Sequence, residues 1–510
     1  MKDKRPPMIF RTTTLALAAL LAAPQVNAQT NAQTNAQTNA QTNAQTDAAL
    51  RDAAQRAIDS NPEITGRLNA LRAGDDGVDI ARAGLRPRVA VEGLAARTND
   101  SISSRNPESG KLNEAGAALT ASQLLWDGLA TWRGVDRAQR ERGVRWYELA
   151  DATEQVALEA ARAHFDVLRF RRLVQMAEDN YVQHRYVQGQ VSSRVQAGVS
   201  RGVDLEQSGA RLALAEANLT SETANLHDVT TRHLRIVGSA PPAGTQHTPL
   251  VADGLPAMAG EAVAIALRDS PAISAAVENL RAARAAASAS EGAYQPRIEA
   301  RIRSGIGHNF DGVPEQMRDT KAELVINWNL YNGGADQARV RQGANLLNRA
   351  ADQRDQACRD ARQITAIAYS DVRKLSEQLP ALDRNTLASE KARDAYRQQF
   401  DIGQRSLLDL LNSENELYTA RRSYLNAQID LSIAQARILA ATQRLTRQLA
   451  LNVSFPPAPP AEAAGAPDDR PARCPVEVAE LLTTPRSELD ARAVRLIQAA
   501  PALVKPATPR

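Results

Sequence analysis

Two short regions of the chain alternate between apolar and charged residues. Between residues 297 and 306, apolar side chains stand at even-numbered positions and charged side chains stand at odd-numbered positions. The first set is Ile298, Ala300, Ile302 and Ile306, and the second is Arg297, Glu299, Arg301 and Arg303. Residues 321–330 alternate in the same way. Because successive side chains of a strand point to opposite faces, both regions predict strands of some ten residues with one apolar face. Barrel strands that span a membrane have this pattern, and so do soluble hairpins.

The longest stretches have helical composition. Leu129 to Arg194 and Gly334 to Gln399 each span 66 residues, or about 100 Å as a helix. Shorter helices are predicted at Pro62–Gly84 and Val203–Val237, and end to end these match the length of one long helix. Pro380 is expected to kink the second long helix.

The shorter helix that follows the second long helix carries a heptad pattern. Large residues recur every seven positions: Leu410, Leu417, Tyr424, Leu431, Ile438 and Leu445. Alanine follows the inner four by three positions. Large residues that face small ones predict a close antiparallel coiled coil, so this stripe is core.

The chain is duplicated. Residues 60–64 align with residues 269–273, and Leu-Trp-Asp-Gly at 125–128 aligns with Leu-Tyr-Asn-Gly at 330–333. Each copy has the order helix, two strands, long helix, turn, returning helix. Its opening helix has a proline in the first turn and a capping residue, Asn61 or Ser270, just before it. We therefore expect a first structural repeat at 48–250 and a second at 251–452.

The two ends of the chain differ from this body. Residues 1–28 combine a basic start, a short Leu/Ala run and small residues at a cleavage position, which predicts a secretory signal peptide. Five Asn-Ala-Gln-Thr tetrapeptides follow, so residues 29–47 are predicted to be a low-complexity tether. The tail at 453–510 is rich in proline, and a short helix is expected only at 487–499.

Composition narrows the function classes. Aromatic residues make up 4% of the chain and mean hydropathy is −0.39, which suits long helices packed through alanine better than thick globular cores. Removing residues 1–28 lowers the formal charge from +4 to +1, so the basic balance indicates no nucleic-acid partner. Cys358 and Cys474 are the two cysteines; a disulfide between them is one option, which the spacing does not specify.

Catalytic chemistry is not indicated. The six histidines show no spacing with cysteine or carboxylate residues that would hold a metal, and no phosphate-binding loop or nucleophile motif occurs. Gly305-Ile306-Gly307 begins like a dinucleotide fingerprint, but Phe310 stands where the third glycine is needed. Gly333-Gly334 is interpreted as a strand-to-helix turn. We expect no enzyme activity, no prosthetic group or other cofactor, and no bound metal.

The duplicated helix, hairpin and coiled coil behind a signal peptide resemble the TolC family of outer-membrane exit ducts. The resemblance covers residues 48 to about 452, and its most specific stretch is Gln-Phe-Asp-Ile-Gly-Gln-Arg-Ser-Leu-Leu-Asp-Leu-Leu-Asn at 399–412. It implies an α+β membrane protein in which three copies form a twelve-stranded barrel, continued by a helical tunnel across the periplasm. The implied partners are an inner-membrane ABC transporter, a periplasmic adaptor, an exported protein or drug as cargo, and outer-membrane lipid.

The resemblance also implies a gate at the periplasmic tip. There, the family's constricting aspartate matches Asp409, while a second family aspartate is replaced by Asn412. Arg405 and Asp204 match residues that hold the tip shut, and Phe400 replaces a tyrosine of that network. Without the resemblance, each of these charges would be a solvated residue of a helical turn.

Two rival functions remain open. The same fold could serve a proton-driven drug or metal efflux pump, or the chain could be a periplasmic coiled-coil scaffold without a pore. Within the family, the sequence of residues 399–412 is similar to that of the branch that serves type I secretion, which favours that function.

Overall fold

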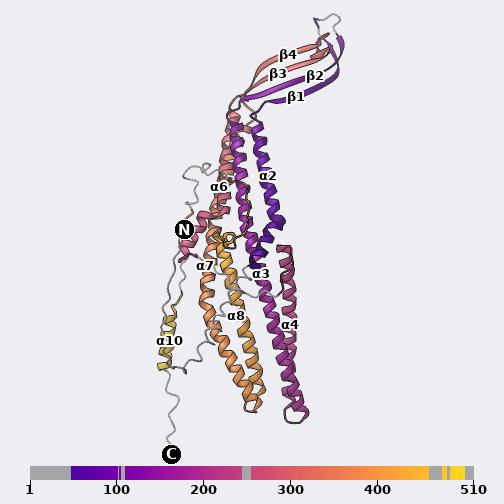
Figure 1. Cartoon of the computed structure of the whole chain (residues 1–510). Helices are drawn as coiled ribbons and strands as arrows, with labels where there is room; N and C mark the ends of the chain where they lie inside the picture. The colour runs from indigo at the N-terminus through magenta and orange to yellow at the C-terminus, as the bar shows by residue number, and fades with distance from the viewer. Residues whose placement is uncertain are drawn as a thin grey trace, which may run out of the picture.

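A computed structural model describes residues 48–101, 103–104, 109–243, 254–458, 474–478 and 483–499. The predicted signal peptide (1–28) and tether (29–47) lie outside these residues. Figure 1 shows a β-sheet at one end of a long array of helices, with two helical hairpins at the opposite end. Each half of the chain contributes one hairpin of strands and one long helical hairpin, in the order that the sequence duplication predicts.

The sheet has four antiparallel strands in the order β1-β2-β3-β4. Their bounds are β1 Arg88–Ser101, β2 Ser109–Trp126, β3 Arg297–His308 and β4 Arg318–Asn327. The pairing of β2 with β3 joins the two repeats into one sheet. Within the described residues, strands β1 and β4 each pair on one side only, so the sheet of a single chain has two open edges.

The two faces of the sheet differ as the alternation predicts. The strand register places seven exposed apolar side chains on one face: Val89, Val91, Leu119, Ile302, Ile306, Leu324 and Ile326. Charged side chains occupy the other face, where Arg301 and Lys321 both pair with Glu323 at 3.5 and 3.2 Å. One face is therefore suited to lipid and the other to water.

Aromatic residues gather where the sheet meets the helices. Trp126 ends β2, while Trp328 and Tyr331 follow β4, and all three are exposed. The following helix begins after Gly333 and Gly334, whose positive φ angles of 70° and 86° make the strand-to-helix turn that the sequence predicts. Exposed aromatic rings at this level are typical of a membrane–water boundary.

Two helices of 67 residues, α3 (Ala130–Gln196) and α7 (Ala335–Asp401), run the length of the helical part. The shorter helices α2 (Pro62–Ala83) and α6 (Pro271–Ser290) pack against them near the sheet, and α4 (Gly202–Val237) and α8 (Leu407–Ala441) pack beyond (Figure 1). The predicted caps are confirmed: Asn61 and Ser270 accept hydrogen bonds from the first turns of α2 and α6. No helix in the described part of the chain is long and apolar enough to cross a membrane.

The core lies midway along the helices. It joins the helical turns at residues 48–60 to α3, to α8 and to the short helix α9 (Leu445–Gln448). Of the predicted stripe, Tyr424 and Leu431 are only half-buried, while helix α8 buries further residues such as Ile429, because it packs against both α3 and α7. Helix α4 buries mainly Ser208, Ala215, Glu222 and Val229 at heptad spacing and leaves its other side exposed. In one protomer α4 is therefore an edge helix.

A buried carboxylate on α3 connects to α9 beside this core. Glu154 of α3 accepts hydrogen bonds from Thr446 of α9, from the hydroxyl at 2.9 Å and from the backbone N–H at 3.3 Å. Burial raises the pKa of Glu154 to about 7, which the bonds to Thr446 only partly offset.

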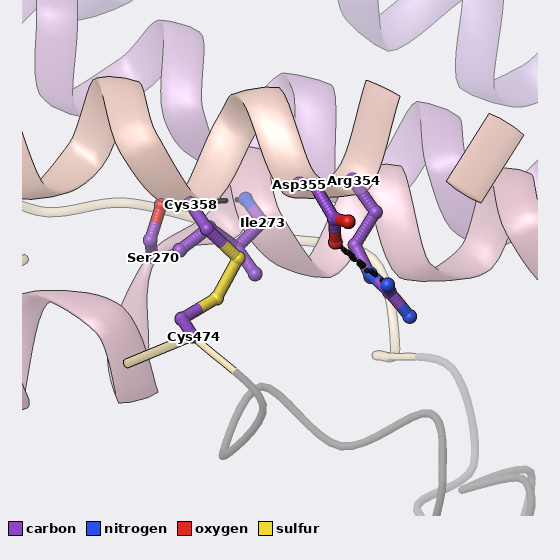
Figure 2. Close-up of a disulfide and its surroundings, with 6 residues drawn as sticks. All are labelled: Ser270, Ile273, Arg354, Asp355, Cys358 and Cys474. Atoms are coloured by element: carbon purple, nitrogen blue, oxygen red, sulfur yellow. Dashed lines mark hydrogen bonds and ion pairs between the residues drawn. A yellow bond between two sulfur atoms is a disulfide. The ribbon is translucent and has the colours of Figure 1, made fainter. Parts of the chain in front are cut away.

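The C-terminal tail is tied to the second repeat. A disulfide joins Cys474 to Cys358 of α7 beside α5 (Ala259–Asp269) and α6, with the Cα atoms 5.5 Å apart (Figure 2). Helix α10 (Arg486–Ala499) falls where the sequence places a short helix. Helix α7 runs through Pro380 without interruption, so this proline does not end it.

Candidate functional site

The helical hairpins end in two equivalent turns at the pole opposite the sheet (Figure 1). Each turn contains a glycine with positive φ, Gly198 at 73° and Gly403 at 77°, which lets the chain reverse directly after a long helix. The sequence-predicted residues Asp204, Phe400, Arg405, Asp409 and Asn412 lie in or next to these turns.

Each aspartate is the third residue of its helix and accepts hydrogen bonds from residues at the helix start. Asp409 accepts a hydrogen bond from the Ser406 hydroxyl at 2.9 Å, and Ser406 in turn accepts from the Asp409 backbone N–H at 3.2 Å. Asp204 accepts from the Ser200 hydroxyl and from the Arg201 N–H, at 2.9 and 3.2 Å. Carboxylates are stabilised at helix N-termini. The two negative charges are thus fixed at the pole, facing the same end of the molecule.

Arg405 is held by its own hairpin. Its guanidinium lies 3.8 Å from the Asp409 carboxylate, donates to the Gln399 side chain at 3.0 Å, and sits 5.0 Å from the centre of the Tyr396 ring. Arg405 and Asp204 make no ion pair within one protomer, so a contact between them would have to join different protomers. That contact stays a prediction.

Phe400 is a core residue of the tip. Its ring is buried among Val187 and Val191 of α3 and Leu410 of α8, and the Arg194 guanidinium lies 4.9 Å from its centre. An apolar ring at this position joins the two hairpins. It serves packing, where a tyrosine hydroxyl would serve hydrogen bonding.

Polar contacts also join the hairpins. Arg211 of α4 donates to Asn412 of α8 at 3.0 Å, and Arg422 of α8 is paired with Glu222 of α4. Glu222 is buried and Arg422 is partly exposed, so water reaches this ion pair only from the side of the arginine. No sequence motif indicates these partners, because they lie about two hundred positions apart.

The contact between the hairpins contains a polar cleft. A cavity of about 280 Å³ lies beside the tips, lined by residues that include Gln183, Arg393 and Glu414. Nearby His184 of α3 is buried, and its pKa is lowered by that burial and by Arg211. Within the described residues no group of histidine, cysteine and carboxylate side chains could hold a metal ion. The features of the tips that could serve a function are therefore charged side chains and packed apolar side chains.

Sequence comparison connects the chain to known channels. The profile of the family described as "Outer membrane efflux protein" matches residues 53–232 and 262–443. The outer membrane efflux protein BepC of Brucella suis is 25% identical over 79% of this chain and 88% of its own length. The outer membrane protein TolC of Escherichia coli is 21% identical over 79% and 84%, and the proteases secretion protein PrtF of Dickeya chrysanthemi is 22% identical over 73% and 83%.

Solved structures share the fold. A membrane protein from Pseudomonas aeruginosa superposes with a TM-score of 0.71 at 18% identity, over 78% of this chain and 93% of its own. The Campylobacter jejuni CmeC outer membrane channel gives 0.70 at 13% identity, over 78% and 86%. The predicted α+β fold, a barrel sheet continued by a helical tunnel, is confirmed.

Proposed function

We propose that this chain, which belongs to the outer membrane efflux protein family, is the outer-membrane exit channel of a type I secretion system. The chain is an outer-membrane protein, as its relatives are. Three copies would form the working channel, with a periplasmic adaptor and an inner-membrane ABC transporter as partners and a protein as cargo.

The open sheet is the observation that best supports a channel. It has one exposed apolar face, one charged face and two unpaired edges. In lipid an unpaired edge leaves backbone groups without partners, which costs several kcal/mol for each group. Closure of the sheet with β1 and β4 of neighbouring copies removes both edges and places the charged face around a water-filled lumen. The half-exposed α4 would find cover in the same assembly.

Two observations favour protein secretion as the function. The tip sequence at 399–412 resembles the branch of the family that serves type I secretion, and one relative is named as a proteases secretion protein. The rival function, drug or metal efflux with a proton-driven pump, is supported by the relative named as an efflux protein. A scaffold without a pore leaves the exposed apolar sheet face unexplained.

At the tips, the proposed role is control of the channel entrance. A ring of three Asp409 carboxylates would attract cations, and Arg405, bound to Asp409 in each protomer, would reduce the charge of that ring. Bonds between hairpins, such as Arg422 with Glu222, would keep the tips together until a partner engages them.

A deletion strain distinguishes the two tasks. The strain is complemented with the wild-type chain or with a chain that lacks β1, and two outputs are measured: the amount of protein exported to the medium, and the minimal inhibitory concentrations of drugs. We expect that deletion abolishes export while drug resistance changes little, and that only the wild-type chain restores it. Lost resistance with unchanged export would favour the efflux pump, and no change in either output would contradict a channel.

A further inference from the structure

The loop between β3 and β4 folds back onto the sheet. Its residues 309–317 include the short turn η2 (Phe310–Gly312), and Asn309, Asp311 and Glu315 have positive φ angles of 49°, 53° and 60°. Three non-glycine residues with this conformation in so short a segment require tertiary contacts to hold them. The shape of the loop is therefore determined by what it touches.

The main contact is the ring of Phe310, which is buried against a floor of glycines. A Cβ atom added to Gly305 would lie 2.0 Å from the ring, and one added to Gly116 would lie 2.5 Å from it. Gly307, which pairs with Gly116 across β2 and β3, lies under the same ring. Any side chain at Gly305 or Gly116 would displace Phe310.

Polar bonds fasten the loop at both sides of the ring. Arg303 donates to the Asp311 carboxylate, with the Nη2 and Oδ1 atoms 2.9 Å apart, and its guanidinium lies 5.2 Å from the centre of the Phe310 ring. Asn309 donates from its side chain to the backbone oxygen of Asn113 in β2 at 2.8 Å. The loop is thus bound to two strands that come from different repeats.

The face that the loop covers is the charged one. Gly305 and Gly307 alternate with Ile306 and share their face with Arg301 and Arg303. Strand β3 leaves the helices at its start, so the loop that follows it lies at the end of the sheet farthest from them (Figure 1). In a closed barrel that end is the outer mouth, and the charged face is the lumen.

We propose that residues 309–317 form an outer size filter, anchored by Phe310 and clasped by Arg303 with Asp311. Three copies narrow the outer mouth of the barrel and exclude bulky hydrophilic solutes that approach from outside, while water and small solutes pass. The filter rests on the proposed channel and adds a selectivity element at the end opposite the Asp409 ring.

The test measures access to the lumen from outside. Ser122 faces the lumen side of β2, closer to the helices than the loop. Because Cys358 and Cys474 are bonded to each other, Ser122→Cys would introduce the one free thiol of the chain. Intact cells are treated either with a small hydrophilic maleimide or with a maleimide on a bulky hydrophilic polymer, and labelling rates are compared.

Two substitutions release the loop by different routes. Phe310→Ala removes the anchor, and Gly305→Ala leaves the anchor but fills its site. We expect each to raise the labelling rate by the bulky reagent more than about tenfold, because lost burial of a large ring shifts the loop toward its open state by at least that factor. The small reagent should label all variants at similar rates. Val313→Ala, at an exposed position of the same loop, is the matched control and should leave both rates unchanged.

The outcomes separate the filter from the channel. If the bulky reagent labels both released variants no faster than the parent, with intact trimers and normal labelling by the small reagent, the filter is wrong and the channel stands. If the bulky reagent already labels the parent as fast as the small one, the filter is also wrong. If the small reagent labels no variant, Ser122 does not face an accessible lumen, and both proposals fail.

Discussion

The ion pair between Arg422 and Glu222 gives the sharpest prediction about the tips. Arg422→Met removes the cation that pairs with a carboxylate only 4% exposed and thereby weakens the contact of α8 with α4. An unpaired buried carboxylate destabilises a contact by several kcal/mol, but Arg422 is itself 37% exposed and water can partly replace it. We therefore expect about 1–2 kcal/mol for each protomer.

Threefold repetition multiplies this effect. A loss of about 3–6 kcal/mol across the ring would raise the ratio of open to closed tips by at least about a hundredfold. The assay is single-channel recording of purified protein in planar bilayers, where Arg422→Met should increase the mean conductance or the open time. Adding Glu222→Met should restore the closed tip, because it replaces the stranded charge with an apolar side chain.

The neighbouring residue provides a matched control. Arg421 pairs with Glu390 of α7, within its own hairpin, and both side chains are more than a third exposed. Arg421→Met should leave the conductance close to that of the wild type. If Arg422→Met and Arg421→Met behave alike, contacts between the two hairpins of one protomer do not hold the tips closed, and the reasoning is refuted.

Three further predictions concern charge, pH and redox state. Asp409→Asn keeps the bond to Ser406 but removes the charge, so cation preference in reversal-potential measurements should fall; Arg405→Ser should raise it, and Asp204→Asn should leave it unchanged. Because the folded pKa of Glu154 is about 7, above its ordinary 4.5, the stability linked to its protonation is complete below pH 4.5 and is lost as pH rises through 7. Thermal unfolding should show Glu154→Gln more stable than the wild type at pH 8, by up to about 3 kcal/mol, and equal to it at pH 4; no difference at pH 8 would contradict the raised pKa. Cys358→Ser opens a loop of 116 residues and should lower stability by about 2–4 kcal/mol, an effect that reductant reproduces in the wild type and does not increase in the variant.

Local patterns predicted the elements well. The caps at Asn61 and Ser270, the turn at Gly333–Gly334 and the alternation in β3 each depend on residues within a few positions of one another. The duplication then predicted the order of elements, because a second copy repeats the same local signals. Propensity and periodicity suffice where the physical cause is local.

Contacts between distant segments were not predictable in this way. Sequence patterns indicate only that Phe310 breaks a dinucleotide motif, whereas in the fold its ring anchors a loop on a floor that includes Gly116 from the other repeat. The ring of Tyr396, which lies against the Arg405 guanidinium, is not predictable either, since Tyr396 lies outside the stretch at 399–412. The disulfide stayed open for the same reason: its two cysteines are brought together by the path of the tail.

The most direct test of the channel is the behaviour of the purified full-length chain. Extracted from outer membranes in detergent, it should have the mass of three chains, and in a planar bilayer it should conduct in discrete steps with a preference for cations. This follows from the two open edges, the apolar sheet face and Asp409 at the pole. A monomer that high salt releases from membranes, and that leaves the bilayer conductance unchanged, would contradict the account.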